Sequence, residues 1–160
     1  MKKVLIVLAA LSLAGALLVP ATSFAHRGEP HNAAKAMAEA MKHPLVVRGG
    51  KAARLKIVHV QRGCHVWSNG PKTARGVRVF LQRGARLTVR NEDIDMQKLV
   101  RLPGAHAALG GFIQVDHQST VTFAKAGVYR LRTRTKEMPG MPDVKTTGPD
   151  NPLPMVVVVK

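Results

Sequence analysis

The chain has 160 residues, and the roughly 135 that follow its apolar leader suit one domain with a single hydrophobic core. Its 25 Lys and Arg residues stand against 9 Asp and Glu residues, and this basic excess favours an anionic partner. The single cysteine cannot form an intramolecular disulfide, so a disulfide-stapled fold is excluded.

The first 25 residues have the features of a secretory signal peptide. A pair of lysines precedes an apolar run over residues 4–19, and Ser23 and Ala25 are the small residues of a cleavage site. The run is too short to be a good membrane span. We therefore expect cleavage after Ala25, export to the periplasm or the extracellular space, and no transmembrane segment in the mature chain. A mature chain from His26 would carry 23 basic residues against 9 acidic ones, because two lysines leave with the signal.

The charge also limits the class of partner. A basic chain inside a cell would suggest nucleic acid, but for an exported chain we expect an acidic protein or an anionic envelope surface, and no nucleic acid. The charges are dispersed along the sequence. Arg130, Arg132 and Arg134 alternate with Leu131 and Thr133, which is typical of a strand with one solvated face.

Residues 26–53 are expected to form an N-terminal extension. Asn32 can cap a short alanine-rich helix over residues 33–42, which Pro44 would end. A helix of about three turns must dock against the rest of the protein to persist. The glycine pair within residues 48–51 indicates a linker.

From residue 54 onward the sequence predicts β-structure. Short segments that are alternating or apolar throughout are separated by turn signals, a spacing that indicates an all-β sandwich or barrel. The last segment is apolar throughout, so we expect it to be central or buried on both faces. The candidate strands span residues 55–60, 76–81, 86–90, 97–102, 112–115, 119–123, 128–132 and 155–159.

The order of these segments resembles the cupredoxin family. Residues 79–91 are similar to the family's pattern of strand, glycine turn, strand and asparagine, and residues 120–131 are similar to the segment that leads to its metal loop. The pairing of residues 63–67 with residues 146–151 resembles exported cupredoxin-like proteins of bacteria that have a divergent metal site. The resemblance covers residues 54–160 and implies a cupredoxin-like Greek-key β-sandwich with copper as its cofactor.

The usual copper ligands of the family are absent. Plastocyanin and azurin carry a histidine shortly after the asparagine, where this chain has Met96 or Gln97. The family also places a cysteine and a histidine around the last loop, whereas residues 132–143 contain neither and offer only Met138 and Met141. Ordinary blue-copper electron transfer is therefore not implied.

The lone cysteine offers a replacement ligand. A thiolate and an imidazole are ligands that copper and zinc favour, and a thioether shifts the preference toward Cu(I). If the strand at residues 55–60 runs toward the loop after Asn91, the Cys-His pair reaches the same end as the methionines. Neighbouring strand residues point to opposite faces, so both members of the pair reach one ion only if the chain bends at Gly63. The expected copper ligands are Cys64, His65, Met96, Met138 and Met141.

Other interpretations stay open beside this one. Cys64 can be a buried thiol packed against Trp67. A mature N-terminus at His26, with His31 or His43, can form a copper-binding histidine brace. The fold can also act without metal, as a module that binds an anionic partner through its basic surface.

The remaining polar residues suggest no catalysis. His106 and His117 are expected to face solvent, and the acids within residues 92–95 to form a turn. No catalytic triad, paired carboxylates or phosphate-cradling loop stands out in the sequence, so we do not expect an enzyme. The expected function is copper handling or sequestration, or electron transfer through a non-standard Cys/His/Met site.

Overall fold

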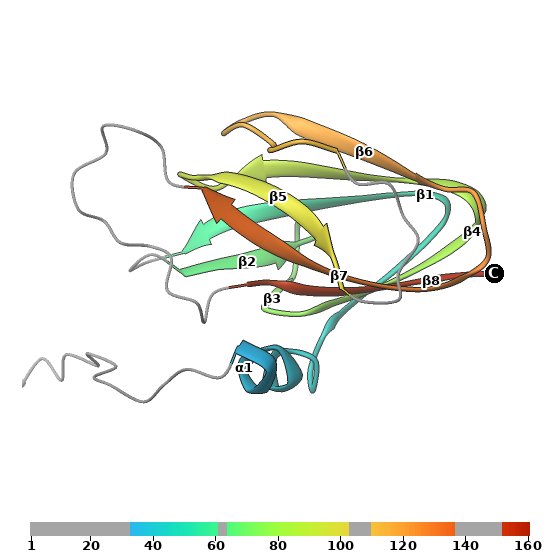
Figure 1. Ribbon diagram of the computed structural model, residues 1–160, viewed down its shortest axis with the longest axis horizontal. Coiled ribbons are helices and arrows are strands. Elements are labelled where there is room, and N and C mark those ends of the chain that lie inside the picture. Colours follow the sequence, from blue (N-terminus) through green and yellow to red (C-terminus); the bar gives the residue numbers. More distant parts are fainter. Residues whose placement is uncertain (1–32, 61–63, 103–109, 137–151) are drawn as a thin grey trace, which may run out of the picture.

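The computed structural model describes residues 33–60, 64–102, 110–136 and 152–160, apart from the side chains of Ala33 and Cys64. One short helix lies near the N-terminus and the rest is β-structure (Figure 1). No helix in these ranges is long and apolar enough to span a membrane. The elements are α1 (Ala33–Ala40), β1 (Leu45–Val60), β2 (Cys64–Ser68), β3 (Thr73–Ala74), β4 (Val77–Glu92), β5 (Met96–Arg101), β6 (Gln118–Phe123), β7 (Gly127–Lys136) and β8 (Pro154–Val159).

Two long strands bend and so belong to both layers of a sandwich. β1 and β4 are parallel from the Leu45–Val77 pair to the Val58–Glu92 pair. Gly50 and Gly84 adopt φ values of 57° and 81°, a region that glycine enters without steric cost, and both strands turn back there at the right-hand end of Figure 1. The strand order is β3-β2-β1-β4-β8-β7-β5, and β6 pairs with the second half of β4.

The core fills the space between the two layers. The first half of β4 pairs with β8, which pairs with β7, and the second half of β1 pairs with β2. Every second side chain points inward from each layer, so buried and exposed residues alternate along β4 and β7 with the period of two that is typical of strands. The fully buried members include Ile57, Trp67, Val79, Leu87, Leu131 and Val157.

The prediction of an all-β class is confirmed, with differences in detail. The candidate strands at residues 76–81 and 86–90 are one bent strand, β4. The segment at residues 64–68 forms a strand, β2, that the sequence did not predict. The strand expected at residues 112–115 is wrong, because only an isolated bridge joins Ile113 to Gln97. The carbonyl of Ile113 accepts a hydrogen bond from the amide of Gln97 across this bridge and a second one from the Asn91 side chain.

The sheet begins earlier than expected. β1 starts at Leu45, whose amide donates to the carbonyl of Gly76, so the expected boundary at residue 54 falls inside β1. Residues 48–51 are the bend of that strand and not a linker. The bend is tight, because a Cβ on Gly49 would lie 2.6 Å from the Cβ of Ala53.

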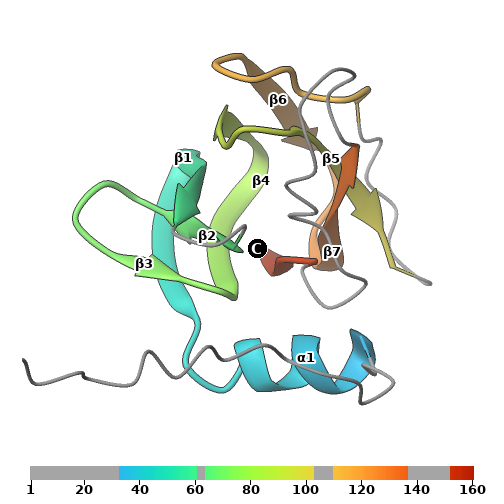
Figure 2. The same ribbon diagram turned by 90° about the vertical axis from the view of Figure 1, so that its left-hand side faces the viewer.

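The helix docks beneath the layer that holds β8 and β7, as Figure 2 shows from the end of the sandwich. Gly76 allows this close approach. A Cβ on Gly76 would collide with the carbonyl oxygen of Ala40 and lie 2.8 Å from the Sδ atom of Met41. The docking that a short helix needs is therefore supplied where α1 ends and β4 begins.

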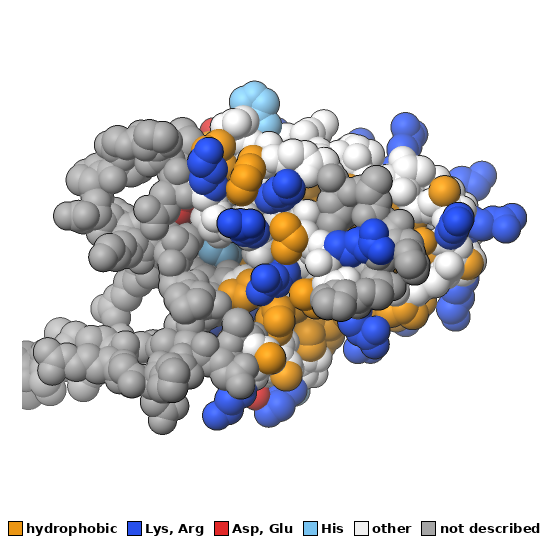
Figure 3. Space-filling view, in the orientation of Figure 1, with side chains coloured by type: hydrophobic (Ala, Val, Ile, Leu, Met, Phe, Trp, Pro, Cys, Tyr) orange, Lys and Arg blue, Asp and Glu red, His pale blue; other side chains and the backbone are white. Residues whose placement is uncertain are grey.

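The two ends of the sandwich carry different charge. Outside α1, the acidic residues of the described part are Glu92, Asp93, Asp95 and Asp116, and all of them lie where β4 ends. The bent end carries exposed lysines and arginines, which project at the right of Figure 3. They include Lys51 beside the β1 bend, Arg83 beside the β4 bend, Lys125 in the turn before β7, and the C-terminal Lys160.

Candidate functional site

The candidate site lies at the end opposite the bends. The parallel pairing of β1 with β4 brings the last residues of β1 beside the loop that follows β4. The β1–β2 hairpin places His59 opposite His65, and β5 and β7 place Met96 opposite Lys136. The strand at residues 55–60 therefore runs toward the loop after Asn91, which was the condition for the expected metal site.

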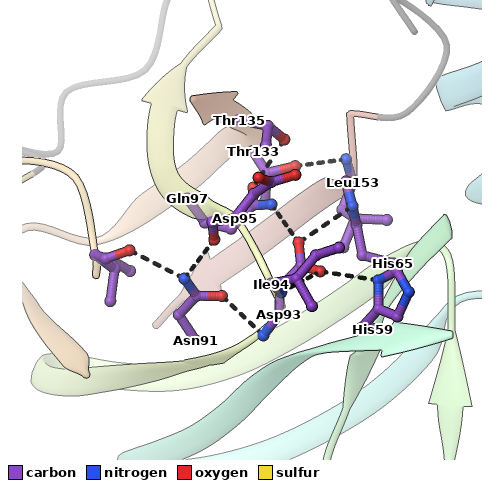
Figure 4. Close-up of polar contacts among 11 residues, drawn as sticks. His59, His65, Asn91, Asp93, Ile94, Asp95, Gln97, Thr133, Thr135 and Leu153 are labelled. Carbon is purple, nitrogen blue, oxygen red and sulfur yellow. Dashed lines mark hydrogen bonds and ion pairs between the residues drawn. The ribbon is translucent and has the colours of Figure 1, made fainter. Parts of the chain in front are cut away.

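A buried carboxylate, Asp93, is the centre of this end (Figure 4). Its Oδ1 atom lies 3.3 Å from Nδ1 of His59 and accepts a hydrogen bond from the amide of Ile94. Its Oδ2 atom lies 3.4 Å from Nδ1 of His65 and accepts a 2.6 Å hydrogen bond from Nε2 of Gln97. One carboxylate thus holds two imidazoles and one amide.

The histidines differ in exposure. The side chain of His65 is 1% exposed, as is that of Asp93, whereas the side chain of His59 is 30% exposed. A buried carboxylate beside an imidazole favours a proton on the facing nitrogen and fixes the orientation of the ring. Asp93 therefore positions His65 inside the sandwich and His59 at its rim.

Buried amide side chains hold the loop that carries Asp93. Nδ2 of Asn91 donates to the carbonyls of Asp95 and Ile113 at 2.8 and 3.0 Å, and its Oδ1 accepts from the amide of Asp93. The Oγ1 atom of Thr135 donates to Oε1 of Gln97. Each amide group is used in the orientation that satisfies its neighbours, so the loop is held from β4, β5 and β7 together.

The structure brings two of the expected ligands to this end. His65 is buried against Asp93, and Met96 is 8% exposed at the start of β5. Cys64 is the first residue of β2 and pairs with Val60, but its side chain lies outside the described part. Met138, Met141 and His26 also lie outside it. Among the described side chains, no group of three His, Cys, Asp or Glu residues is placed to hold a metal ion.

The other sequence expectations have mixed outcomes. His117 is exposed, as expected, and its Nδ1 donates to the carbonyl of Val115. His43 is exposed, while His31 and His106 lie outside the described residues. Trp67 is fully buried and donates from Nε1 to the carbonyl of Pro154; whether Cys64 packs against it stays a prediction.

Sequence reasoning missed the central role of Asp93 and of His59. The acids of residues 92–95 were expected to form a plain turn, yet Asp93 and Asp95 are 2% and 5% exposed. His59 lies opposite His65 because β1 and β2 pair antiparallel in this register, so the sequence signals His59 only once β2 is recognised as a strand. No local signal marks Asp93, since its partners come from three separate strands.

No family model matches the sequence, and no curated protein matches it. Among solved structures, a Cu(I) form of an amicyanin mutant is 15% identical over 68% of this chain and 82% of its own, with a TM-score of 0.44. A purple cupredoxin from Nitrosopumilus maritimus is 13% identical over 68% of this chain and 99% of its own, with a TM-score of 0.41. Both similarities are distant, in sequence and in structure.

Proposed function

We propose that this chain is an exported copper-binding protein whose site lies at the Asp93 end of the sandwich. The observation that supports it best is the buried contact between Nδ1 of His65 and Oδ2 of Asp93. In metal sites, a carboxylate of this kind orients the ring while the other ring nitrogen binds the metal. His65 also adjoins the only cysteine of the chain.

The chemistry of the donors favours copper. A thiolate from Cys64, the imidazole of His65 and the thioether of Met96 form a soft set, which suits Cu(I) better than the hard cations. Met138 and Met141 are the further thioethers of the proposal. Asp93 is a positioning residue here, because its oxygens already contact Gln97 and both histidines. With copper bound, the protein would either store and transfer Cu(I) or carry single electrons.

The direct test is metal stoichiometry by native mass spectrometry after loading with Cu(I) or Cu(II). The protein should bind one copper, and Cys64→Ser and His65→Gln should each weaken the affinity. Asp93→Asn should weaken it about 10- to 100-fold, as is usual when a residue that orients a ligand is changed. An intense visible band with Cu(II) would indicate thiolate ligation.

A matched histidine gives the control. His117→Gln removes an exposed imidazole near the same end of the sandwich, and it should leave copper affinity unchanged. Absence of bound copper in the unmodified protein, or equal affinity in Cys64→Ser, His65→Gln and the control, would contradict the proposed site.

The N-terminal histidine brace is a separate copper proposal with its own signature. Its copper affinity would depend on a free amine at His26, so one extra residue before His26 would abolish binding while Cys64→Ser would not. N-terminal sequencing of the protein recovered from the cell envelope tests the premise of both, namely cleavage after Ala25.

A different observation favours a second function, a metal-free module that binds an anionic partner. Exposed Lys51, Arg83, Lys125 and Lys160 share the bent end, whereas the acidic residues described outside α1 lie at the opposite end. Such a separation of charge gives one end of the protein a positive potential. The polar cluster would then be structural, since Asp93 has protein partners at both oxygens. Binding to an anionic surface by protein without copper would support this function.

A further inference from the structure

The outer face of the layer that holds β4, β8 and β7 is apolar where a solvated face would be polar. Val158 of β8 pairs with Phe80 on one side and with Val128 on the other. Phe80 and Val158 are only partly buried, and Val128 is 52% exposed. This row explains why β8 is apolar on both faces, although one of those faces lies outside the core.

α1 turns this face into a groove. Met37 of α1 and Met41, which directly follows the helix, line a cavity of about 540 Å³ together with the strands. Figure 3 shows hydrophobic side chains gathered beside α1 and over β8, with Lys and Arg side chains around them. The volume lies within the range of small-molecule sites, which are mostly apolar with a few polar groups that fix orientation.

Two arginines supply those polar groups. Arg78 and Arg130 lie in the row next to the apolar one, and each pairs with Val156, so they flank the groove from both neighbouring strands. Both are exposed, and within the described part of the chain neither forms an ion pair with a carboxylate. A third cation, Arg48, stacks 5.1 Å from the centre of the Phe80 ring.

We propose that this groove binds a linear amphiphile with one anionic head group. The apolar tail lies along the row of Phe80, Val158 and Val128, and the head group lies between Arg78 and Arg130. Guanidinium groups present planar pairs of donors that match the oxygens of a carboxylate or a phosphate. The groove thus places apolar side chains for the tail next to two positive charges for the head group.

Isothermal titration calorimetry on the purified protein, below the micelle concentration of each probe, tests the proposal. Dodecanoate and dodecyl phosphate should bind with a stoichiometry of one, and the tighter of the two identifies the head group. Dodecyltrimethylammonium has the same tail with the opposite charge and should bind at least about tenfold more weakly, and acetate should not bind.

Matched variants locate the site. Val128→Glu places a negative charge in the groove and should weaken dodecanoate binding at least about tenfold, and Arg78→Gln with Arg130→Gln should do the same. Val60→Glu is the control, because Val60 is 37% exposed and does not line the groove, and Arg86→Gln with Arg134→Gln is the control for lost charge. Circular dichroism checks that each variant is folded.

Three results would overturn the proposal. The first is no binding of either anionic probe, and the second is equal binding of the cationic probe. The third is self-association that Val128→Glu abolishes while dodecanoate does not bind, which would assign the groove to a second copy of the chain.

Discussion

At the scale of single residues, Asp93 is the group on which the polar end depends. It is the carboxylate that both His59 and His65 contact, and it accepts from Gln97 and the amide of Ile94. Removing one partner from a buried network leaves the others without their hydrogen bonds, which costs more than an average contact contributes. The stability of this end should therefore respond to a change of one atom in Asp93.

Asp93→Asn should lower the free energy of unfolding by about 2–4 kcal/mol, because the buried imidazole of His65 and the partly exposed one of His59 lose their carboxylate partner. Urea unfolding at neutral pH measures the change. Asp116→Asn is the control: its side chain is 74% exposed and 3.9 Å from Arg90, so the change should stay within about 0.5 kcal/mol. Equal effects of the two substitutions would contradict a central role for Asp93.

Trp67→Phe should destabilise the protein by about 1–3 kcal/mol, because the buried carbonyl of Pro154 loses its donor. Tyr129→Phe removes a comparable 2.6 Å hydrogen bond to the carbonyl of Lys125, which is only partly buried and can be reached by water. It should therefore cost less. Urea unfolding followed by circular dichroism compares the two, and a larger effect at Tyr129 would refute the argument from burial.

At the scale of elements, the position of α1 depends on the absence of a side chain at Gly76. Gly76→Ala should displace the helix, because the new methyl group meets the Ala40 carbonyl and the Met41 Sδ atom. Loss of helical signal in circular dichroism and faster proteolysis within residues 33–44 would show it. Gly111→Ala is the control, since a Cβ there meets nothing within 4 Å. An unchanged helix in Gly76→Ala would show that α1 docks by other contacts.

The same scale explains which elements the sequence predicts well. Alternation and turn residues are local signals, and they place β4, β6, β7 and β8 within a few residues of their bounds. β2 was not predicted, because the segment Cys64–Ser68 is short and its Cys-His pair suggested a metal site rather than a strand. Residues 112–115 form only the isolated bridge from Ile113 to Gln97, and the Asn91 side chain also bonds the Ile113 carbonyl, a contact between residues distant in the sequence. The candidate site is less predictable still, since Asp93 has no local pattern that shows burial.

At the scale of the whole molecule, the separation of charge predicts where an anionic surface binds. Lys51→Glu with Lys125→Glu should weaken binding to vesicles that contain phosphatidylglycerol, and the remaining binding should fall with added salt. Lys72→Glu with Arg134→Glu makes the same change in net charge away from the bent end and should have the smaller effect. Vesicle co-sedimentation measures both, and equal loss would show that only the net charge matters.

The bends at Gly50 and Gly84 have a consequence for how the protein opens. Because β1 and β4 run through both layers, neither layer has a complete set of strands of its own, and one layer cannot separate without pulling apart the other. We therefore expect the slowest amides of the two layers to exchange with solvent deuterium at one common opening free energy. A difference of more than about 1 kcal/mol between the amides of β8 and those of the second half of β1 would show two independent units instead. The two layers are therefore expected to open together as one cooperative unit.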